Sequence, residues 1–331
     1  MEYQAHTQTG ILLNANEYYD NQPEEIRSRL AELAMTMAYN RYPDNSQTVI
    51  REAYAKAMNL TADQILAGNG SDQMLGYIIS RTLKPHDVLV TLKPDFSMYD
   101  YYAESYGAKV AKFACNESGD FDVDEFIAFA KKKDAKMILF SNPNNPTGHC
   151  LSIADVEKIV TADHKIPVVI DEAYMEFADE ESALSLVDKH DNLYVTRTLS
   201  KAYGLAGLRV GFLVTNARRM QELRGSFVPY ALNSFSAAAA AIVLEYDISA
   251  RVDAIKAERD RVYEALKDDV WVYPSAANFL YARSDHKEAL LEALAEKDIV
   301  IRNYAGTPYF RITIGTPEDN DTIIQIVREN V

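Results

Sequence analysis

Short runs of apolar residues alternate with longer stretches of helical pattern through the middle of the chain. The runs are rich in β-branched and aromatic residues, and helical patterns such as 123–132 and 152–161 separate most of them. Strands that alternate with helices predict an α/β fold built on a mostly parallel sheet, with helices on its faces. The predicted strands are 88–91, 109–114, 136–140, 167–170, 193–196 and 210–214.

The pattern changes after about residue 236, where a long helical stretch begins. Four strand-like runs follow, with one helical segment among them and another after them, which is typical of a smaller α+β domain. We therefore expect a large domain over 36–239 and a small domain that combines 1–35 with 240–331. The strand-like runs are 271–273, 279–282, 299–302 and 310–314.

Charge and composition exclude several classes of partner. The chain has 34 Lys and Arg against 49 Asp and Glu, a net charge of −15, which repels nucleic acids and anionic membranes. Its two cysteines predict reduced thiols, and its six scattered histidines predict no metal site. No apolar run approaches the ~20 residues that span a bilayer. The first nine residues lack an apolar leader segment, so we expect a cytoplasmic protein.

The strongest chemical signal is Ser200-Lys201, which follows one predicted strand, together with Arg209, which precedes the next. A lysine between a hydroxyl group and an arginine is suited to form an imine with an aldehyde cofactor that carries a phosphate. Ser200 and Arg209 would hydrogen-bond that phosphate, the arginine through two parallel N–H groups. A solvated lysine in a Gly-rich turn is the alternative.

Two more polar segments directly follow predicted strands. Asp171 ends a run of β-branched residues, so its carboxylate is buried and needs a cation, for which a protonated pyridine nitrogen is suited. Tyr174, three residues later, could reach a phenolic oxygen of the same cofactor, although a helix-capping Asp171 is the alternative. Asn145 lies in a loop that two prolines stiffen, which favours a fixed amide donor to a ring oxygen.

Small residues at 70–72, Gly70-Ser71-Asp72, open a predicted helix and offer backbone N–H groups to a phosphate. The dinucleotide-binding fingerprint is incomplete here, because its third glycine is replaced by Gln73. A nicotinamide cofactor is therefore disfavoured.

In this order, these segments resemble the fold-type I pyridoxal-phosphate aminotransferases, and within them the branch that acts on L-histidinol phosphate. Matches extend from about residue 13 to 316 and include 13–17, 40–44, 197–201, 278–279 and 311–316. The resemblance implies pyridoxal 5′-phosphate as cofactor and two domains, the larger with the mostly parallel sheet.

The resemblance also implies a role for each matching residue around the cofactor. Lys201 would bind the cofactor aldehyde and later move a proton, and Asp171 would keep the ring nitrogen protonated. Asn145 and Tyr174 would hold the phenolic oxygen. Phe96 would stack on the ring, although the family usually has Thr-Tyr where this chain has Asp95-Phe96. The residues implied at the phosphate are Gly70, Ser71, Asp72 through its backbone N–H, Ser200 and Arg209.

Further matches concern the partner subunit and the substrates. Tyr42 would reach the phosphate of the neighbouring subunit's cofactor, which implies a homodimer with shared active sites. Arg311 would bind the α-carboxylate of glutamate, and Arg302 and Tyr18 would help to bind a substrate phosphate. The implied reaction converts L-histidinol phosphate and 2-oxoglutarate into imidazole-acetol phosphate and L-glutamate, a step of histidine biosynthesis. An aminotransferase for aromatic or other amino acids, and a lyase that resembles threonine-phosphate decarboxylase, are the alternatives.

Overall fold

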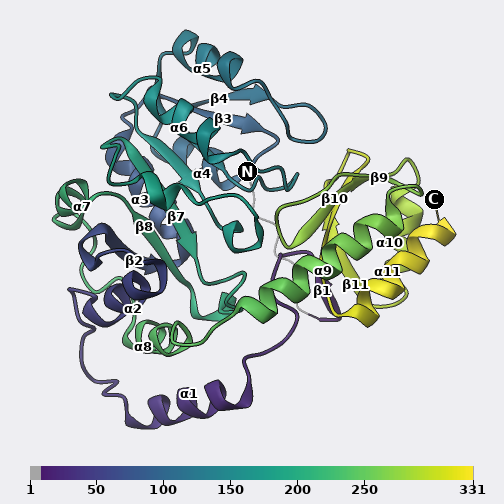
Figure 1. Cartoon of the computed structure of the whole chain (residues 1–331), viewed down its shortest axis with the longest axis horizontal. Coiled ribbons are helices and arrows are strands. Elements are labelled where there is room, and N and C mark those ends of the chain that lie inside the picture. The colour runs from purple at the N-terminus through teal and green to yellow at the C-terminus, as the bar shows by residue number, and fades with distance from the viewer. Residues whose placement is uncertain (1–8, 331) are drawn as a thin grey trace.

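Two β-sheets organise the protein. The structure, a computed structural model, describes residues 9–330, so all but the last residue of the polar N-terminal segment considered above lies outside the described residues. A seven-stranded sheet with its helices forms the larger part, and a five-stranded sheet with three helices forms the smaller part (Figure 1). The predicted α/β class is confirmed.

The large sheet has the strand order β2-β8-β7-β6-β5-β3-β4. Its pairs β3–β4, β3–β5, β5–β6 and β6–β7 are parallel, whereas β8 is antiparallel to both of its neighbours. All six predicted strands are present, with ends that differ from the prediction by at most two residues. The strands are β2 (Ile65–Asn69), β3 (Val88–Lys93), β4 (Lys109–Ala114), β5 (Ala135–Ser141), β6 (Val168–Asp171), β7 (Leu193–Thr198) and β8 (Val210–Val214).

Both faces of the large sheet are buried, as expected for a mostly parallel sheet. Consecutive strand residues point to opposite faces, so Val169 packs into one hydrophobic cluster while Val168 and Ile170 pack into the other. The first face is covered by α3 (Gly70–Thr82), α4 (Met98–Ser105) and α7 (Ala217–Arg224). The second is covered by α2 (Thr48–Met58), α5 (Val123–Lys132), α6 (Ile153–Thr161) and α8 (Ser234–Val243).

The small sheet has the order β1-β11-β12-β10-β9 and combines both ends of the chain. Strand β1 (Ile11–Leu13) pairs in parallel with β11 (Ile299–Asn303), which brings residues almost 290 positions apart side by side. The next helix, α1 (Glu24–Thr36), instead packs against α8 of the large domain. The sequence predicted that 1–35 belong to the small domain, but α1 packs on the large one, so the domain boundaries stay a prediction. The remaining elements are α9 (Ser249–Leu266), β9 (Trp271–Val272), β10 (Phe279–Arg283), α10 (Lys287–Ala295), β12 (Tyr309–Thr313) and α11 (Pro317–Asn330).

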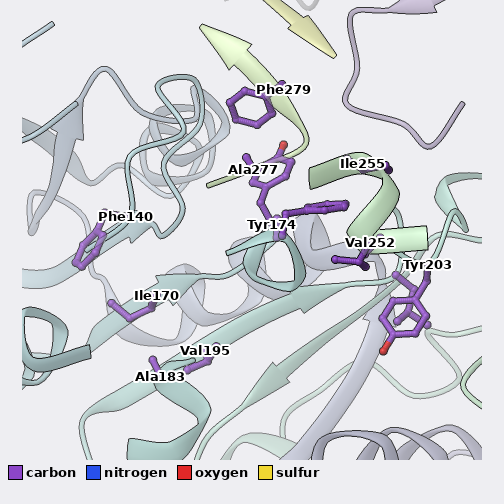
Figure 2. Packing of buried hydrophobic residues seen from close by; sticks show 14 of the residues in the cluster. Phe140, Ile170, Tyr174, Ala183, Val195, Tyr203, Val252, Ile255, Ala277 and Phe279 are labelled. Atoms are coloured by element: carbon purple, nitrogen blue, oxygen red, sulfur yellow. The ribbon is translucent and has the colours of Figure 1, made fainter. Parts of the chain in front are cut away.

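One hydrophobic cluster joins the two parts (Figure 2). Ile170 and Val195 belong to the large sheet, and Tyr174 extends from it towards Phe279 of β10, with the two rings 5.1 Å apart edge to face. Because apolar contacts continue across the junction, residues from both domains are held together at the place where the candidate residues lie.

Two predictions from composition can be compared with the structure. Within residues 9–330, no helix is long and apolar enough to cross a membrane. Cys115 and Cys150 are both free thiols.

A buried ion network lies beside the end of β6. Arg197 on β7 pairs with Glu172 at 2.8 Å and with Glu176 at 2.7 Å, and its side chain is only 5% exposed. Ser182 donates a further hydrogen bond to Glu172. Asp171 ends β6 and lines the cavity described below, whereas Arg197, Glu172 and Glu176 do not line it, so this network is separate from the candidate site.

We predict that Arg197→Met lowers the free energy of unfolding by about 3–5 kcal/mol, because it leaves two buried carboxylates without a cation. Urea unfolding of both proteins measures the change. The control is Arg218→Met, which removes an arginine that is 58% exposed and pairs with Asp191, and it should cost less than about 1 kcal/mol. Equal losses in the two variants would contradict the prediction.

Candidate active site

A cavity of about 470 Å³ opens at the edge of the large sheet where the parallel strands end. Strands β11 and β12 of the small domain supply Arg302 and Arg311 to its wall. The cavity brings together most of the residues predicted from the sequence. These are Ser71, Asp72, Phe96, Asn145, Asp171, Tyr174, Ser200, Lys201, Arg209, Arg302 and Arg311.

Strand ends explain why these residues meet. Asp171 is the last residue of β6, and Lys201 follows the end of β7 by three residues. Since parallel strands have their carboxyl ends at one edge, these groups converge there. Strand β8 runs in the opposite direction, so Arg209, just before it, lies at the same edge. The segment 70–72 opens α3 directly after β2 and completes this edge.

The amino group of Lys201 lies inside the cavity. Its Nζ donates a hydrogen bond to the carbonyl oxygen of Ala15 at 2.7 Å and lies 5.8 Å from the ring centre of Tyr174. Burial, together with the positive charge of Arg311, lowers the pKa of Lys201 to about 8. The lysine is therefore closer to its neutral, nucleophilic form at pH 7 than an ordinary lysine is.

Asp171 is 4% exposed, and each of its carboxylate oxygens accepts a hydrogen bond from a hydroxyl group. Tyr99 donates to Oδ2 at 2.8 Å, and Thr196 donates to Oδ1 at 2.9 Å. Burial raises the pKa of Asp171 to about 6, and the hydroxyl donors oppose that shift. Because neutral hydroxyls do not cancel the charge of a buried carboxylate, this group is suited to a cationic ligand.

A hydrogen-bonded chain connects Tyr174 with Arg311. The Tyr174 hydroxyl accepts from Nδ2 of Asn16 at 2.9 Å and from Nδ2 of Asn145 at 3.4 Å. Arg311 donates to Oδ1 of Asn145 at 2.5 Å and to the carbonyl oxygen of Asn14 at 2.9 Å. Within residues 9–330 the buried Nε of Arg311 has no hydrogen-bond partner, so this guanidinium retains a donor for a ligand.

The start of α3 and Arg209 form a cradle for an anion. A Cβ atom on Gly70, which has a φ of +77°, would lie 2.6 Å from Nη2 of Arg209, so only glycine allows this close approach. Arg209 also reaches Ser200 Oγ at 3.4 Å. The carboxylate of Asp72 pairs with Arg209 at 2.9 Å, and the role of its backbone N–H at a phosphate stays a prediction.

Three predicted residues do not line the cavity. Gly70 lies directly behind the cradle. Tyr18 is half-buried, with the guanidinium of Arg251 4.3 Å above its ring. Tyr42 is 83% exposed, and its ring stacks on Tyr230 at 4.9 Å.

Sequence reasoning gave no role to several residues that shape the cavity. Asn14 and Asn16 lie in segment 13–17, which matches the resembling family. Ser141 carries a hydroxyl at a strand end, and that position could have identified it. Tyr304 follows β11 in a short turn that has no recognisable pattern. The polar residues that line the cavity or directly contact its groups without a predicted role are Asn14, Asn16, Asp95, Ser97, Tyr99, Tyr102, Ser141, Thr196, Thr198 and Tyr304.

Fold and site together define a transferase of amino groups, and comparison with known proteins agrees. The chain matches the family of class I and II aminotransferases over residues 8–327 and belongs to that family. It is therefore an enzyme, an aminotransferase.

Two relatives within this class are histidinol-phosphate aminotransferases. The chain is 34% identical to the histidinol-phosphate aminotransferase of Clostridium novyi over 325 residues, which cover 96% of this chain and 91% of the relative. It is 35% identical to the enzyme of the same name from Clostridium kluyveri, over 95% of this chain and 91% of the relative.

Solved structures show the same fold. The histidinol-phosphate aminotransferase of Sinorhizobium meliloti, determined in complex with pyridoxal-5′-phosphate, superposes with a TM-score of 0.88 at 22% identity, over 97% of this chain and 90% of that one. The L-threonine-O-3-phosphate decarboxylase of Porphyromonas gingivalis superposes with a TM-score of 0.82 at 23% identity, over 96% and 98%. The predicted fold type I is confirmed.

The lowered pKa of Lys201 gives a testable pH dependence. A lysine with a pKa of about 8 is deprotonated above that pH, so the rate at which cofactor-free protein binds pyridoxal phosphate should rise with pH and level off above about 8. Stopped-flow absorbance of the lysine-bound cofactor measures that rate. Arg311→Gln removes a positive charge and should move the midpoint upwards. A wild-type profile that still rises at pH 10 would contradict this prediction.

Proposed function

We propose that this aminotransferase transfers the amino group of L-histidinol phosphate to 2-oxoglutarate, which yields imidazole-acetol phosphate and L-glutamate in histidine biosynthesis. One observation carries the proposal. Arg302 and Arg311 are register partners on the paired strands β11 and β12, and both line the cavity that contains Lys201. Like charges directly opposite each other destabilise a sheet, so this pair is suited to anionic substrates.

Pyridoxal phosphate is the cofactor of this enzyme, and the residues of the cavity fit it. Ser71 and Asp72 at the start of α3 line the cavity together with Arg209, so backbone N–H groups and a guanidinium are available to a phosphate. We propose that Ser71, Ser200 and the backbone N–H of Asp72 complete that phosphate site. Phe96 lines the cavity and would pack on the ring. When bound, the cofactor supplies an aldehyde for Lys201 and a ring that accepts electrons.

The protein groups around the ring would each act on a different atom of the cofactor or substrate. Asp171 would hold a proton on the ring nitrogen, because its buried carboxylate favours a cation beside it. Asn145 and Tyr174 would direct an amide N–H and a hydroxyl at the phenolic oxygen. With the amino donor bound, the free Nζ of Lys201 would move a proton from the substrate Cα to the cofactor carbon that carried the aldehyde.

Arg311 and Arg302 would bind different anionic groups of the substrates. Arg311 is 6% exposed and is held by Asn145 and Asn14, so it presents a fixed fork to an α-carboxylate. Arg302 is less buried and would bind the phosphate of the amino donor, and the half-buried Tyr18 would assist it. The identity of 34% to the Clostridium novyi relative supports this choice over an aromatic amino donor.

The first experiment follows the absorbance of the loaded enzyme after addition of L-histidinol phosphate alone. We expect loss of the lysine-bound absorbance and release of imidazole-acetol phosphate, and neither change in Lys201→Ala. Arg302→Gln should raise KM for L-histidinol phosphate about 10- to 100-fold, since a hydrogen bond to a charged group is lost. Unphosphorylated L-histidinol is the matched control, because its KM should not change.

Two other outcomes would indicate a different substrate from the one proposed. Turnover of aromatic amino acids without turnover of L-histidinol phosphate would favour an aromatic aminotransferase. Release of CO₂ from threonine phosphate would favour a lyase, like the L-threonine-O-3-phosphate decarboxylase of Porphyromonas gingivalis, which has the same fold. Both outcomes leave the family and the cofactor unchanged.

We also propose a homodimer in which Tyr42 completes the partner's phosphate site. Exposed apolar side chains gather near Tyr42, and its stacking partner Tyr230 donates a backbone hydrogen bond to Asn45. Large exposed apolar surfaces of this kind mark protein interfaces. Other exposed apolar residues in the same two segments are Met35, Tyr39, Val49 and Val228. A cytoplasmic location stays a prediction.

Mixed dimers test the shared site. Lys201→Ala and Tyr42→Ala subunits should each be nearly inactive alone at limiting cofactor. If Tyr42 acts across the interface, mixing them rebuilds one intact site in each mixed dimer, and about a quarter of the wild-type activity returns. If Tyr42 acts within its own subunit, every site lacks one residue and mixing restores nothing. Size-exclusion chromatography with light scattering checks that both variants remain dimeric.

A further inference from the structure

Asp95 places a second carboxyl group in the cavity that contains Asp171. It lies after β3, where the resembling enzymes usually have threonine, and no step described above uses it. In each of its hydrogen bonds the carboxyl group of Asp95 is the acceptor. Oδ1 accepts from the backbone N–H of Phe96 at 2.8 Å and from the hydroxyl of Ser141, and Oδ2 accepts from the backbone N–H of Ser141 at 3.2 Å.

Ser141 connects Asp95 to the loop that follows β5 through a further hydrogen bond. Its Oγ accepts a hydrogen bond from the backbone N–H of Asn145 at 2.9 Å, and its own side chain is buried. A second link, from the Asn144 side chain to the carbonyl oxygen of Pro94 at 3.2 Å, joins the same two segments. The loop after β5 is therefore attached to the segment after β3 at two points.

The amide of Asn145 is the group that this loop presents to the cavity. Its Oδ1 accepts from Arg311 at 2.5 Å, and its Nδ2 donates to Tyr174 at 3.4 Å. A continuous chain of contacts thus runs from Asp95 through Ser141 and Asn145 to Arg311. Each link joins buried or half-buried groups, where hydrogen-bond geometry has large effects.

We propose that Asp95 is a positioning residue, which holds Ser141 and, through it, the backbone of Asn145, so that the Asn145 amide fixes the Arg311 guanidinium for a substrate carboxylate. The proposal rests on the proposed role of Arg311 in carboxylate binding. It does not depend on which amino donor the enzyme uses. Within residues 9–330 the hydrogen bonds of Asp95 go to Phe96 and Ser141 and not to Arg311.

The test measures binding of a carboxylate that does not react. Succinate is titrated into the pyridoxal-phosphate-loaded enzyme by calorimetry, and the unfolding temperature is recorded for each variant. Asp95→Ala and Ser141→Ala should each raise the Kd of succinate about 10-fold, the effect of losing one well-placed hydrogen bond. Because both act through the same chain, the double variant should bind no more weakly than either single one.

Two further variants separate positioning from general stability. Asp95→Asn keeps an oxygen that can accept from Phe96 and from the Ser141 hydroxyl, so it should remain within about twofold of the wild type. Asp134→Asn, an aspartate whose side chain is 85% exposed, is the control and should change nothing. If Asp95→Ala fails to fold, Ser141→Ala tests the same chain.

Three results would overturn the proposal. They are an unchanged succinate Kd in Ser141→Ala, effects that add in the double variant, and variants that lower only the unfolding temperature. Failure of the proposed function gives a different result. In that case the wild type binds succinate but does not convert L-histidinol phosphate, and the comparison among Asp95 and Ser141 variants still holds.

Discussion

Burial of both faces of the large sheet is the constraint on which the site depends. A strand covered on both sides has room only for apolar side chains along its length, as Val168–Ile170 shows. Polar groups are therefore confined to the strand ends. Since most strands are parallel, their carboxyl ends share one edge, and the reactive groups of β5, β6 and β7 collect there.

The same burial changes two charged groups in opposite directions. It disfavours a charge on either residue, so it lowers the pKa of Lys201 to about 8 and raises that of Asp171 to about 6. The lysine becomes a better nucleophile, and the carboxylate becomes a better partner for a cationic ring. Although the protein has a net charge of −15, this edge is suited to anions because Arg209, Arg302 and Arg311 all line the cavity.

The small domain completes the site through contacts that span the whole chain. Asn14 and Asn16 follow β1, which pairs with β11, and they contact Arg311 and Tyr174. The apolar cluster across the junction keeps these partners in place (Figure 2). A buried lysine, Lys287, donates to the carbonyl oxygens of Tyr304 and Thr307, which holds the short turn beside Arg302.

Local pattern was enough to predict six of the seven strands of the large sheet, and it placed Lys201, Asp171 and Asn145 at or just after strand ends. This succeeds because periodicity and strand-end position depend on neighbouring residues alone. Strand β2 was weak in sequence, since its Ala-Gly-Asn end has little β-propensity, and it is stabilised by pairing with β8. The contacts of Arg311 with Asn14 and Asn145 join residues 297 and 166 positions apart. Only the packing of the two domains decides such contacts, because no local pattern encodes which distant groups will meet.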